Sequence, residues 1–331
     1  MTVIESLNLI GLSLEDVREI TTDPIVVDAL ETGDYRVQRD GVRKDIESKL
    51  LTVAHRDYPL RRVDGCDIPE AEARAISQRS FVPRQIGYAE KFCADDFKNT
   101  VLALLTRANL RQSDLTGTML GGLVMSMTMT ENKKHLEPMA WFADQTNADP
   151  QFNQINGYWN LINQAVTQNL ATRVATYANV ALTAGQGIQL MKDVIDNATD
   201  ALDGVAATDK VFYIGRGLRN QLRDDLQNGL VGSTLYAQTI ENGKMVERFD
   251  GIEIRVKHEW DALATSQKGY TAGQSNLCVL TKKQNLVWAI NDTEDLSFEA
   301  FYSRDDMRYI IRNLFVFGVQ IDYPTLISAA Y

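Results

Sequence analysis

The segment VFYIGRGLRNQLRDDL, residues 211–226, combines a short apolar run, two closely spaced glycines and an amphipathic helix pattern. A nucleotide-binding turn begins in this way, because its glycines let the backbone approach a phosphate at a helix N-terminus. The dinucleotide fingerprint also needs a third glycine, and position 220 is Asn. No GxxxxGK[ST] phosphate loop occurs in the chain. A soluble α/β enzyme that binds a nucleotide at Gly215-Arg216-Gly217 is therefore only a minor alternative.

Three arginines of this predicted helix, Arg216, Arg219 and Arg223, recur on one helical face. Such a face could bind an anion or donate ion pairs to another subunit, and arginine is enriched at protein interfaces. We therefore expect subunit contacts at this face. Five further arginines in an extended region upstream are candidates for the same role: Arg61, Arg62, Arg74, Arg79 and Arg84.

Three other fragments imitate catalytic or metal sites and lack the residues that complete them. HRD at 55–57 resembles a kinase catalytic loop, but position 62 is Arg where that loop needs Asn. HE at 258–259 begins like the zinc motif HExxH, but position 262 is Ala. The run NDTED at 291–295 fits an acidic turn better than a calcium loop. We therefore expect no catalytic, cofactor or metal site, and no enzymatic activity.

Composition and charge argue against several other classes of protein. The chain of 331 residues is 44% hydrophobic and 24% charged, as in globular proteins, and is long enough for two or three structural lobes. Its net charge of −10 disfavours binding to nucleic acid or to an anionic membrane surface. Cys66, Cys93 and Cys278 lie far apart, which disfavours a disulfide framework or a zinc site. No apolar run reaches the ~18 residues of a membrane-spanning helix.

The first part of the chain predicts elements that need a neighbour for stability. Residues 1–57 carry short helix signals with little apolar surface. YPLRRV (58–63) and FVPRQIGYAEKF (81–92) look extended, and the polar residues between them predict a long projecting hairpin. Because a lone hairpin is only marginally stable in water, we expect it to rest on another subunit.

The remainder of the chain mixes helices and strands. A helix is predicted from Ala94, a turn is predicted at GYWNLINQ (157–164), and an amphipathic helix is predicted at 187–202. Asn242-Gly243 and Asp250-Gly251 predict tight hairpin turns. Four strands are predicted near the C-terminus: 277–282, 286–291, 296–304 and 307–324.

This order of elements resembles the major capsid protein of tailed double-stranded DNA bacteriophages, which has the Hong Kong-phage-like fold that encapsulins also use. The most specific pieces are F-x-G-I-x-I at 249–254, the strand–turn–helix at 211–226, and R-x-x-x-x-F-G-V-x-I-x-x-P at 312–324. The resemblance covers the chain from about Tyr58 onward. It implies an α+β fold with an N-terminal arm, an extended β-hairpin loop, a peripheral domain with a long helix and a β-sheet, and an axial domain. The implied boundaries are 1–57 for the arm, 58–93 for the extended loop, 94–180 for the first part of the peripheral domain, 181–275 for the axial domain and 276–331 for the β-rich C-terminal part of the peripheral domain.

The resemblance implies a structural protein that self-assembles into the pentamers and hexamers of an icosahedral shell around double-stranded DNA. Its main partner would be further copies of itself, with scaffolding, portal and cement or decoration proteins as additional partners. Packaged DNA would lie near the wall without specific binding, and no membrane is implied. The chain would assemble in the host cytoplasm and reside in the virion capsid. An encapsulin-like compartment around a cargo enzyme is the main alternative, and the long N-terminal arm favours the capsid.

Overall fold

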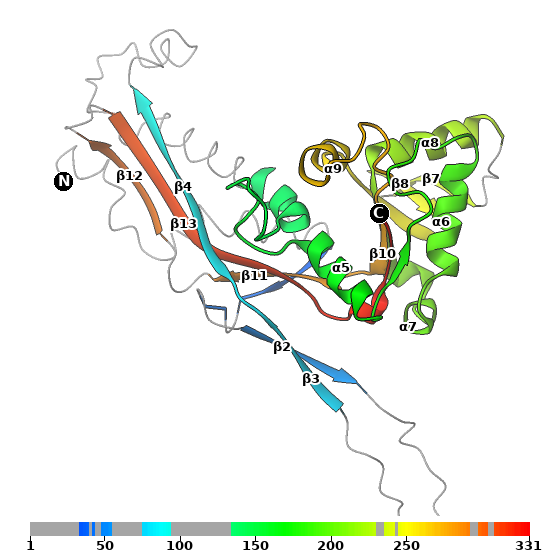
Figure 1. Cartoon of the computed structure of the whole chain (residues 1–331), viewed down its shortest axis with the longest axis horizontal. Coiled ribbons are helices and arrows are strands. Elements are labelled where there is room, and N and C mark those ends of the chain that lie inside the picture. The colour runs from blue at the N-terminus through cyan, green and yellow to red at the C-terminus, as the bar shows by residue number, and fades with distance from the viewer. Residues whose placement is uncertain are drawn as a thin grey trace, which may run out of the picture.

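The computed structural model of the chain describes residues 33–39, 42–43, 48–54, 75–93, 134–229, 235–241, 244–291, 297–303 and 308–331. The helix predicted from Ala94 and most of the predicted arm lie outside these residues. Within the described ranges, no helix is both long and apolar enough to cross a bilayer. Figure 1 shows a long curved sheet on one side of the molecule and a compact region of helices and strands on the other.

The first sheet is built around one long strand, β13 (Arg308–Ile321). Strand β4 (Arg84–Cys93) pairs antiparallel along one side of β13. Strands β12 (Ser297–Ser303) and β11 (Leu286–Asn291) pair in succession along its other side, and β1 (Tyr35–Gln38) adds to β11 in parallel. The second half of β13 is buried on both faces, which explains why its sequence reads as a continuous apolar run.

A two-stranded hairpin projects away from this sheet (Figure 1). Its strands are β2 (Ser48–Ala54) and β3 (Ala75–Phe81), which pair antiparallel with each other. The prediction that 81–92 forms one leg of the hairpin is wrong, because most of that segment forms β4 and pairs with β13. The other predicted leg, 58–63, lies outside the described residues. Pro83 accounts for the change of partner, since proline has no N–H and interrupts a strand ladder.

The base of the hairpin is anchored by a small apolar cluster. Phe81, at the end of β3, packs with Val42, Ala289 and Val316. Gly318 on β13 leaves room for the Phe81 ring, because a Cβ at position 318 would lie 3.3 Å from its Cδ2 atom. The cluster therefore ties the end of β3 to both β11 and β13.

The second sheet has seven strands in the order β5-β14-β10-β6-β9-β8-β7. These strands are β5 (Thr172–Val174), β14 (Ile327–Ala330), β10 (Cys278–Lys282), β6 (Lys210–Gly215), β9 (Ile252–Lys257), β8 (Lys244–Phe249) and β7 (Tyr236–Glu241). The pairs β6–β9 and β5–β14 are parallel, and the other neighbours are antiparallel. Helices α6 (Gln186–Asp196) and α8 (Arg216–Gln227) bury their apolar faces against this sheet.

Both predicted hairpin turns are confirmed. Asp250 and Gly251 have φ angles of 51° and 75°, the left-handed backbone that a tight two-residue turn between strands requires. Glu241 pairs with Lys244, so that only Asn242-Gly243 separates β7 from β8.

The helices of the described residues differ from the prediction at two places. The turn predicted at 157–164 is wrong, because these residues begin helix α5 (Tyr158–Thr167), and residues 134–142 form a further helix. The segment 187–202 is not one helix, because α6 ends at Asp196 and Thr199 starts the short helix α7 (Asp200–Asp203). The Thr199 side chain accepts a hydrogen bond from the Leu202 N–H, as an N-cap does.

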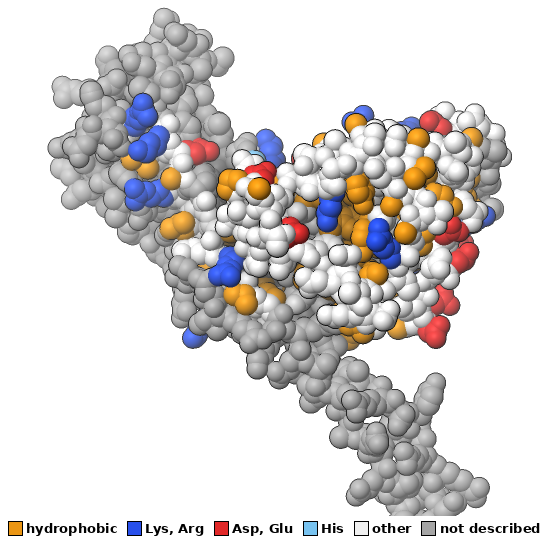
Figure 2. All heavy atoms as spheres, in the orientation of Figure 1, with side chains coloured by type: hydrophobic (Ala, Val, Ile, Leu, Met, Phe, Trp, Pro, Cys, Tyr) orange, Lys and Arg blue, Asp and Glu red, His pale blue; other side chains and the backbone are white. Residues whose placement is uncertain are grey.

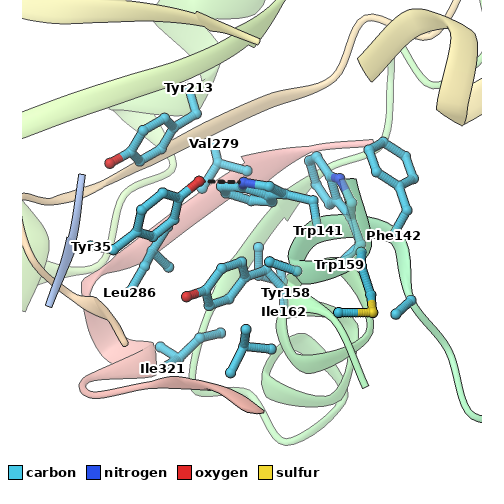
Figure 3. Packing of buried hydrophobic residues seen from close by; sticks show 14 of the residues in the cluster. Tyr35, Trp141, Phe142, Tyr158, Trp159, Ile162, Tyr213, Val279, Leu286 and Ile321 are labelled. Atoms are coloured by element: carbon cyan, nitrogen blue, oxygen red, sulfur yellow. Dashed lines mark hydrogen bonds between the residues drawn. The ribbon is translucent and has the colours of Figure 1, made fainter. Parts of the chain in front are cut away.

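An aromatic core joins the first sheet to the second (Figure 3). Trp141 lies at its centre, with ring centroids 4.9 Å from Tyr158, 5.6 Å from Tyr213 and 4.6 Å from Trp260. The Trp141 Nε1–H donates a hydrogen bond of 2.8 Å to the Tyr35 hydroxyl. The core thus contains side chains from β1, β6, α5, α9 (Trp260–Lys268) and the helix at 134–142.

Candidate functional site

The Gly-Arg-Gly segment at the start of α8 already contacts a carboxylate of the protein itself, that of Asp261. The backbone N–H of Gly217 donates to Oδ2 of Asp261 at 2.7 Å, and the Ser275 hydroxyl donates to Oδ1. A Cβ at Gly215 would lie 2.7 Å from the same Oδ1, so glycine permits this close approach. A phosphate at this turn would meet a carboxylate where it needs hydrogen-bond donors. The nucleotide-binding interpretation of this turn is therefore wrong.

The N-terminus of α6 is capped by the same kind of contact. Its first residue follows Gly185, whose N–H donates to Oδ1 of Asp225 at 2.9 Å. Asp225 is fully buried near the end of α8, and Gln221 also donates to its Oδ1. Because glycine has no side chain with which to cap a helix, each of these two helix starts takes a carboxylate from a neighbouring helix. These contacts link α9 to α8 and α8 to α6.

The three arginines predicted at this helix have different surroundings. Arg219 forms a two-pronged contact with Glu247 on β8, with Nε–Oε2 at 2.9 Å and Nη2–Oε1 at 2.5 Å. These hydrogen bonds raise the pKa of Arg219. Arg216 and Arg223 are exposed, and neither has an ion-pair partner among the residues that the structure describes. A role for these residues in subunit contacts stays a prediction.

The five predicted arginines upstream lie partly in the described region. Arg84 is exposed at the start of β4, and Arg79 belongs to β3. Arg61, Arg62 and Arg74 lie outside the described residues. Their proposed role in subunit contacts likewise stays a prediction.

Four charged residues form what we call the ionic junction: Asp34, Glu137, Arg255 and Lys257. The Asp34 carboxylate accepts from Arg255 and, at 3.0 Å, from Lys257 Nζ. Lys257 also pairs with Glu137. Asp34 is 4% exposed and directly precedes β1, Glu137 lies on the helix at 134–142, and the two cations lie on β9. The ionic junction therefore connects the residue that precedes β1 of the first sheet to strand β9 of the second sheet.

Three buried tyrosines surround the ionic junction, two of them bonded to its carboxylates. The Tyr35 hydroxyl donates to Glu137 Oε1 at 3.0 Å, and the Tyr213 hydroxyl lies 3.2 Å from Asp34 Oδ1. Tyr158 donates to the carbonyl oxygen of Val287. Burial raises the pKa of all three tyrosines, and the nearby carboxylates raise the pKa of Tyr35 and Tyr213 further.

Alkaline pH is expected to unfold the chain before these three tyrosines can ionise in the folded state, so that they ionise as the chain unfolds. Because their pKa values are raised above the unfolded value of about 10, the folded chain binds more protons than the unfolded chain. The stability that this contributes is complete below about pH 10 and is lost as the pH rises further. Burial would lower the pKa of Lys257, but Glu137 and Asp34 outweigh it and raise that pKa, so Lys257 acts in the same direction.

This expectation can be measured by titrating tyrosinate absorbance beside circular dichroism. Ionisation of the three tyrosines should coincide with the loss of secondary structure. A gradual ionisation of all 12 tyrosines in a chain that stays folded would contradict the expected coupling.

Replacing Asp34 by alanine is expected to lower the free energy of unfolding by about 3 kcal/mol, since it leaves two cations without their shared buried carboxylate. Urea denaturation measures the change. The control is Lys283→Gln, because the Lys283–Glu253 ion pair of 2.8 Å joins a lysine that is 34% exposed to a carboxylate that is 22% exposed. The control should cost less than about 1 kcal/mol. Equal losses of unfolding free energy in the two variants would show that the ionic junction stabilises the chain no more than a partly exposed ion pair does.

A cavity of about 210 Å³ lies beside the ionic junction. Its lining includes Glu137, Lys257, His258 and Trp260. Among the described residues, no group of three or more histidine, cysteine, aspartate or glutamate side chains is arranged to hold a metal ion. The cavity therefore borders the ionic junction without offering a metal centre.

Sequence reasoning did not identify the three aspartates that cap the helices and form the ionic junction: Asp261, Asp225 and Asp34. Asp261 lies in the first turn of α9, which is an ordinary place for an acidic residue and gives no sign of its target. The sequences around Asp225 and Asp34 give no sign of the partners of these two carboxylates either. No local pattern reveals these contacts, because each partner lies more than one element away.

No family model and no curated protein matches this chain. Its fold, in contrast, matches solved structures over nearly its whole length. A chain of the satellite phage P4 procapsid that includes the size determination (Sid) protein is similar with a TM-score of 0.58 and 9% identity, and the match covers 96% of each chain. A chain of the capsid of Myoviridae phage XM1 is similar with a TM-score of 0.52 and 11% identity, over 91% of this chain and 90% of that one.

A compartment protein matches as well. A chain of the holo-SrpI encapsulin complex from Synechococcus elongatus PCC 7942 is similar with a TM-score of 0.51 and 7% identity, over 97% of this chain and 95% of that one. At these identities the likeness concerns the fold. The expected α+β class and Hong Kong-phage-like fold are confirmed, and this chain has the fold that phage capsids and encapsulins share.

Proposed function

We propose that this chain is the major capsid protein of a tailed double-stranded DNA phage, a structural subunit that self-assembles into the pentamers and hexamers of an icosahedral shell. The observation that carries the proposal is the match to the P4 procapsid chain, which covers 96% of both chains. As a shell subunit it performs no reaction. It would reside in the virion capsid after assembly in the host cytoplasm.

The architecture of the chain supports this proposal. The β2–β3 hairpin pairs with itself and projects from the body, so a neighbouring subunit is the natural support for it (Figure 1). The net charge of −10 suits a wall that must not adhere to the DNA it encloses. Scaffolding, portal and cement or decoration proteins are the further partners that such a shell would use.

The second candidate is an encapsulin-like compartment around a cargo enzyme, and the SrpI match is the observation that favours it. The two candidates share self-assembly and differ in their contents. A capsid encloses double-stranded DNA, whereas a compartment encloses a protein.

Expression of the full chain alone, followed by size-exclusion chromatography and electron microscopy, tests self-assembly. Closed shells, capsomers or tubes are expected. A small, monodisperse species under all assembly conditions would overturn both candidates. Particles isolated from the native source decide between them, because nuclease-protected double-stranded DNA indicates a capsid and a stoichiometric enclosed enzyme indicates a compartment.

A further inference from the structure

Helix α8 carries two exposed arginines, Arg216 and Arg223, which we call the basic stripe. They are nearly two helical turns apart, so they lie in line on the exposed side of α8, about 10 Å from each other. Neither forms an ion pair with a residue that the structure describes. Arg219, between them, is bonded to Glu247 of β8, so α8 lies over the β8 side of the second sheet.

Two exposed carboxylates lie where α6 ends and α7 begins, at Asp196 and Asp200, and we call them the acidic end. Ser328 of β14 donates a hydrogen bond of 2.7 Å to a carbonyl in the last turn of α6. Thr199, directly before α7, donates to the carbonyl of Thr325, which precedes β14. The acidic end therefore lies on the β14 side of the second sheet, away from the basic stripe. Figure 2 shows acidic side chains along this end of the compact region.

The position of Asp196 favours a cation from outside the chain. Asp196 is the last residue of α6, and a helix has partial negative charge at its C-terminus, so its own helix repels this carboxylate. The last turn of α6 contains no basic residue, and no described lysine or arginine forms an ion pair with either carboxylate of the acidic end. A cation from a second copy would offset the repulsion.

We propose that the basic stripe of one copy of this chain binds the acidic end of the next copy. The two groups are complementary in charge, and they lie at opposite sides of one compact region, so they do not meet within one chain (Figure 1). Both belong to the predicted axial domain, 181–275, so the contact joins like parts of neighbouring copies.

A contact between two different surfaces is head-to-tail, and head-to-tail contacts generate rings when the rotation closes. This inference rests on the proposed function, because pentamers and hexamers are such rings. It adds the surface that each side of an axial domain presents to its neighbour in the ring.

The contact acts on the rate and orientation of assembly more than on its strength, because exposed ion pairs are individually weak. Complementary charges accelerate encounter about ten-fold or more at low ionic strength and disfavour wrong orientations. At 0.01 M ionic strength the Debye length is about 30 Å, so each group acts as a whole; at 1 M it is about 3 Å. The effects of charge reversal should therefore be clear at low salt and disappear at high salt.

Charge reversal tests the pairing. The two single variants are Arg223→Glu and Asp196→Lys, and the second of these places a cation at the helix end that favours it. Circular dichroism checks that each variant is folded, and light scattering with electron microscopy measures the rate of assembly and the yield of closed shells.

Each single variant should assemble about five-fold more slowly than the wild type at low salt, and the variant with both reversals should regain the wild-type rate. The matched control joins Arg223→Glu to Glu90→Lys, at an exposed acidic residue of β4 in the first sheet. It has the same net charge as the double reversal and should stay slow.

A chemical cross-link tests the geometry. Assembled particles of the variant Asp196→Cys with Arg223→Cys are treated with a short bismaleimide. Because each copy is expected to join the next, a denaturing gel should show a ladder that extends to the full pentamer or hexamer. The two single-cysteine variants and the wild type are the controls and should form no ladder.

The outcomes separate this inference from the proposed function. If the wild type assembles and both single reversals keep its rate, the pairing is overturned and the proposed function stands. Equal recovery in the double reversal and its control overturns the pairing too, because net charge alone would then explain the effect. Cross-linking that stops at dimers indicates a two-fold contact and overturns the head-to-tail arrangement. A wild-type chain that never assembles overturns the proposed function and the pairing together.

Discussion

Removal of the β2–β3 hairpin is expected to abolish closed shells while the rest of the subunit stays folded. The suitable deletion spans 49–80 and joins Ser48 to Phe81 through an Asn-Gly turn, because these two residues are register partners at the base of the hairpin. Phe81 keeps its place beside Gly318 and Val316. Since the two strands pair with each other, their loss should change the free energy of unfolding by no more than about 1 kcal/mol. Urea denaturation and electron microscopy measure the two effects.

A shorter deletion is the control for this experiment. Removing 55–74, the residues between the two strands, retains β2 and β3 and tests whether the strands or the residues beyond them make the contact. Shells of normal size from the 49–80 deletion would contradict a role for the hairpin in assembly. Loss of folding in that deletion would contradict the separation of the hairpin from the body.

Replacement of Trp141 by alanine is expected to destabilise the chain by about 4 kcal/mol, within the range for removing a large aromatic side chain from a core. Trp141 is fully buried and packs at a tilt against Tyr158 of α5 and Tyr213 of β6 (Figure 3), and edge-on against Trp260 of α9. The loss is large compared with the 5–15 kcal/mol that stabilises a typical domain, so the folded yield at physiological temperature should also fall. Urea denaturation followed by circular dichroism measures the change.

Trp141→Phe separates packing from hydrogen bonding at the same position. Phenylalanine keeps most of the ring contacts and loses the Nε1–H that donates to Tyr35, so we expect a cost of about 1–2 kcal/mol. Val180→Ala, at a residue that is 44% exposed, should change stability by less than about 0.5 kcal/mol. Equal costs for the phenylalanine and alanine variants would contradict the view that packing dominates at Trp141.

Much of the fold follows from local pattern. Asn242-Gly243 and Asp250-Gly251 predict the two turns, because few other residue pairs adopt the left-handed backbone that such turns need. The apolar run of β13 predicts a long strand, and the burial of its second half on both faces accounts for its composition. The hairpin leg at 81–92 was mispredicted because extended sequence shows that a segment is a strand and does not show its partner. The partner of β4 is β13, near the other end of the chain.

The contacts of the candidate site could be predicted from the sequence less well than the fold. The glycines at 215 and 217 correctly marked the change from strand to helix, since β6 ends at Gly215 and α8 begins at Arg216. The identity of the anion at this Gly-Arg-Gly segment depends on Asp261, which reaches it only after β9 and α9 are packed. Arg219 was predicted to face another subunit, and its guanidinium is bonded to Glu247, an acid on a strand that sequence spacing does not place beside α8. Local periodicity identifies faces of elements, and tertiary packing decides what each face meets.

The position of β14 has a consequence for the order in which the chain is made. This strand lies between β5 and β10 in the second sheet, yet it is formed by residues 327–330. During synthesis, both flanking strands leave the ribosome before the strand that joins them, so the sheet stays open until position 330 has emerged. A copy that stops short of Ile327 leaves two unpaired strand edges and an unfinished core, and it cannot present a complete surface to its neighbours. If the chain forms the proposed shell, this topology restricts incorporation to chains that have been translated through this point.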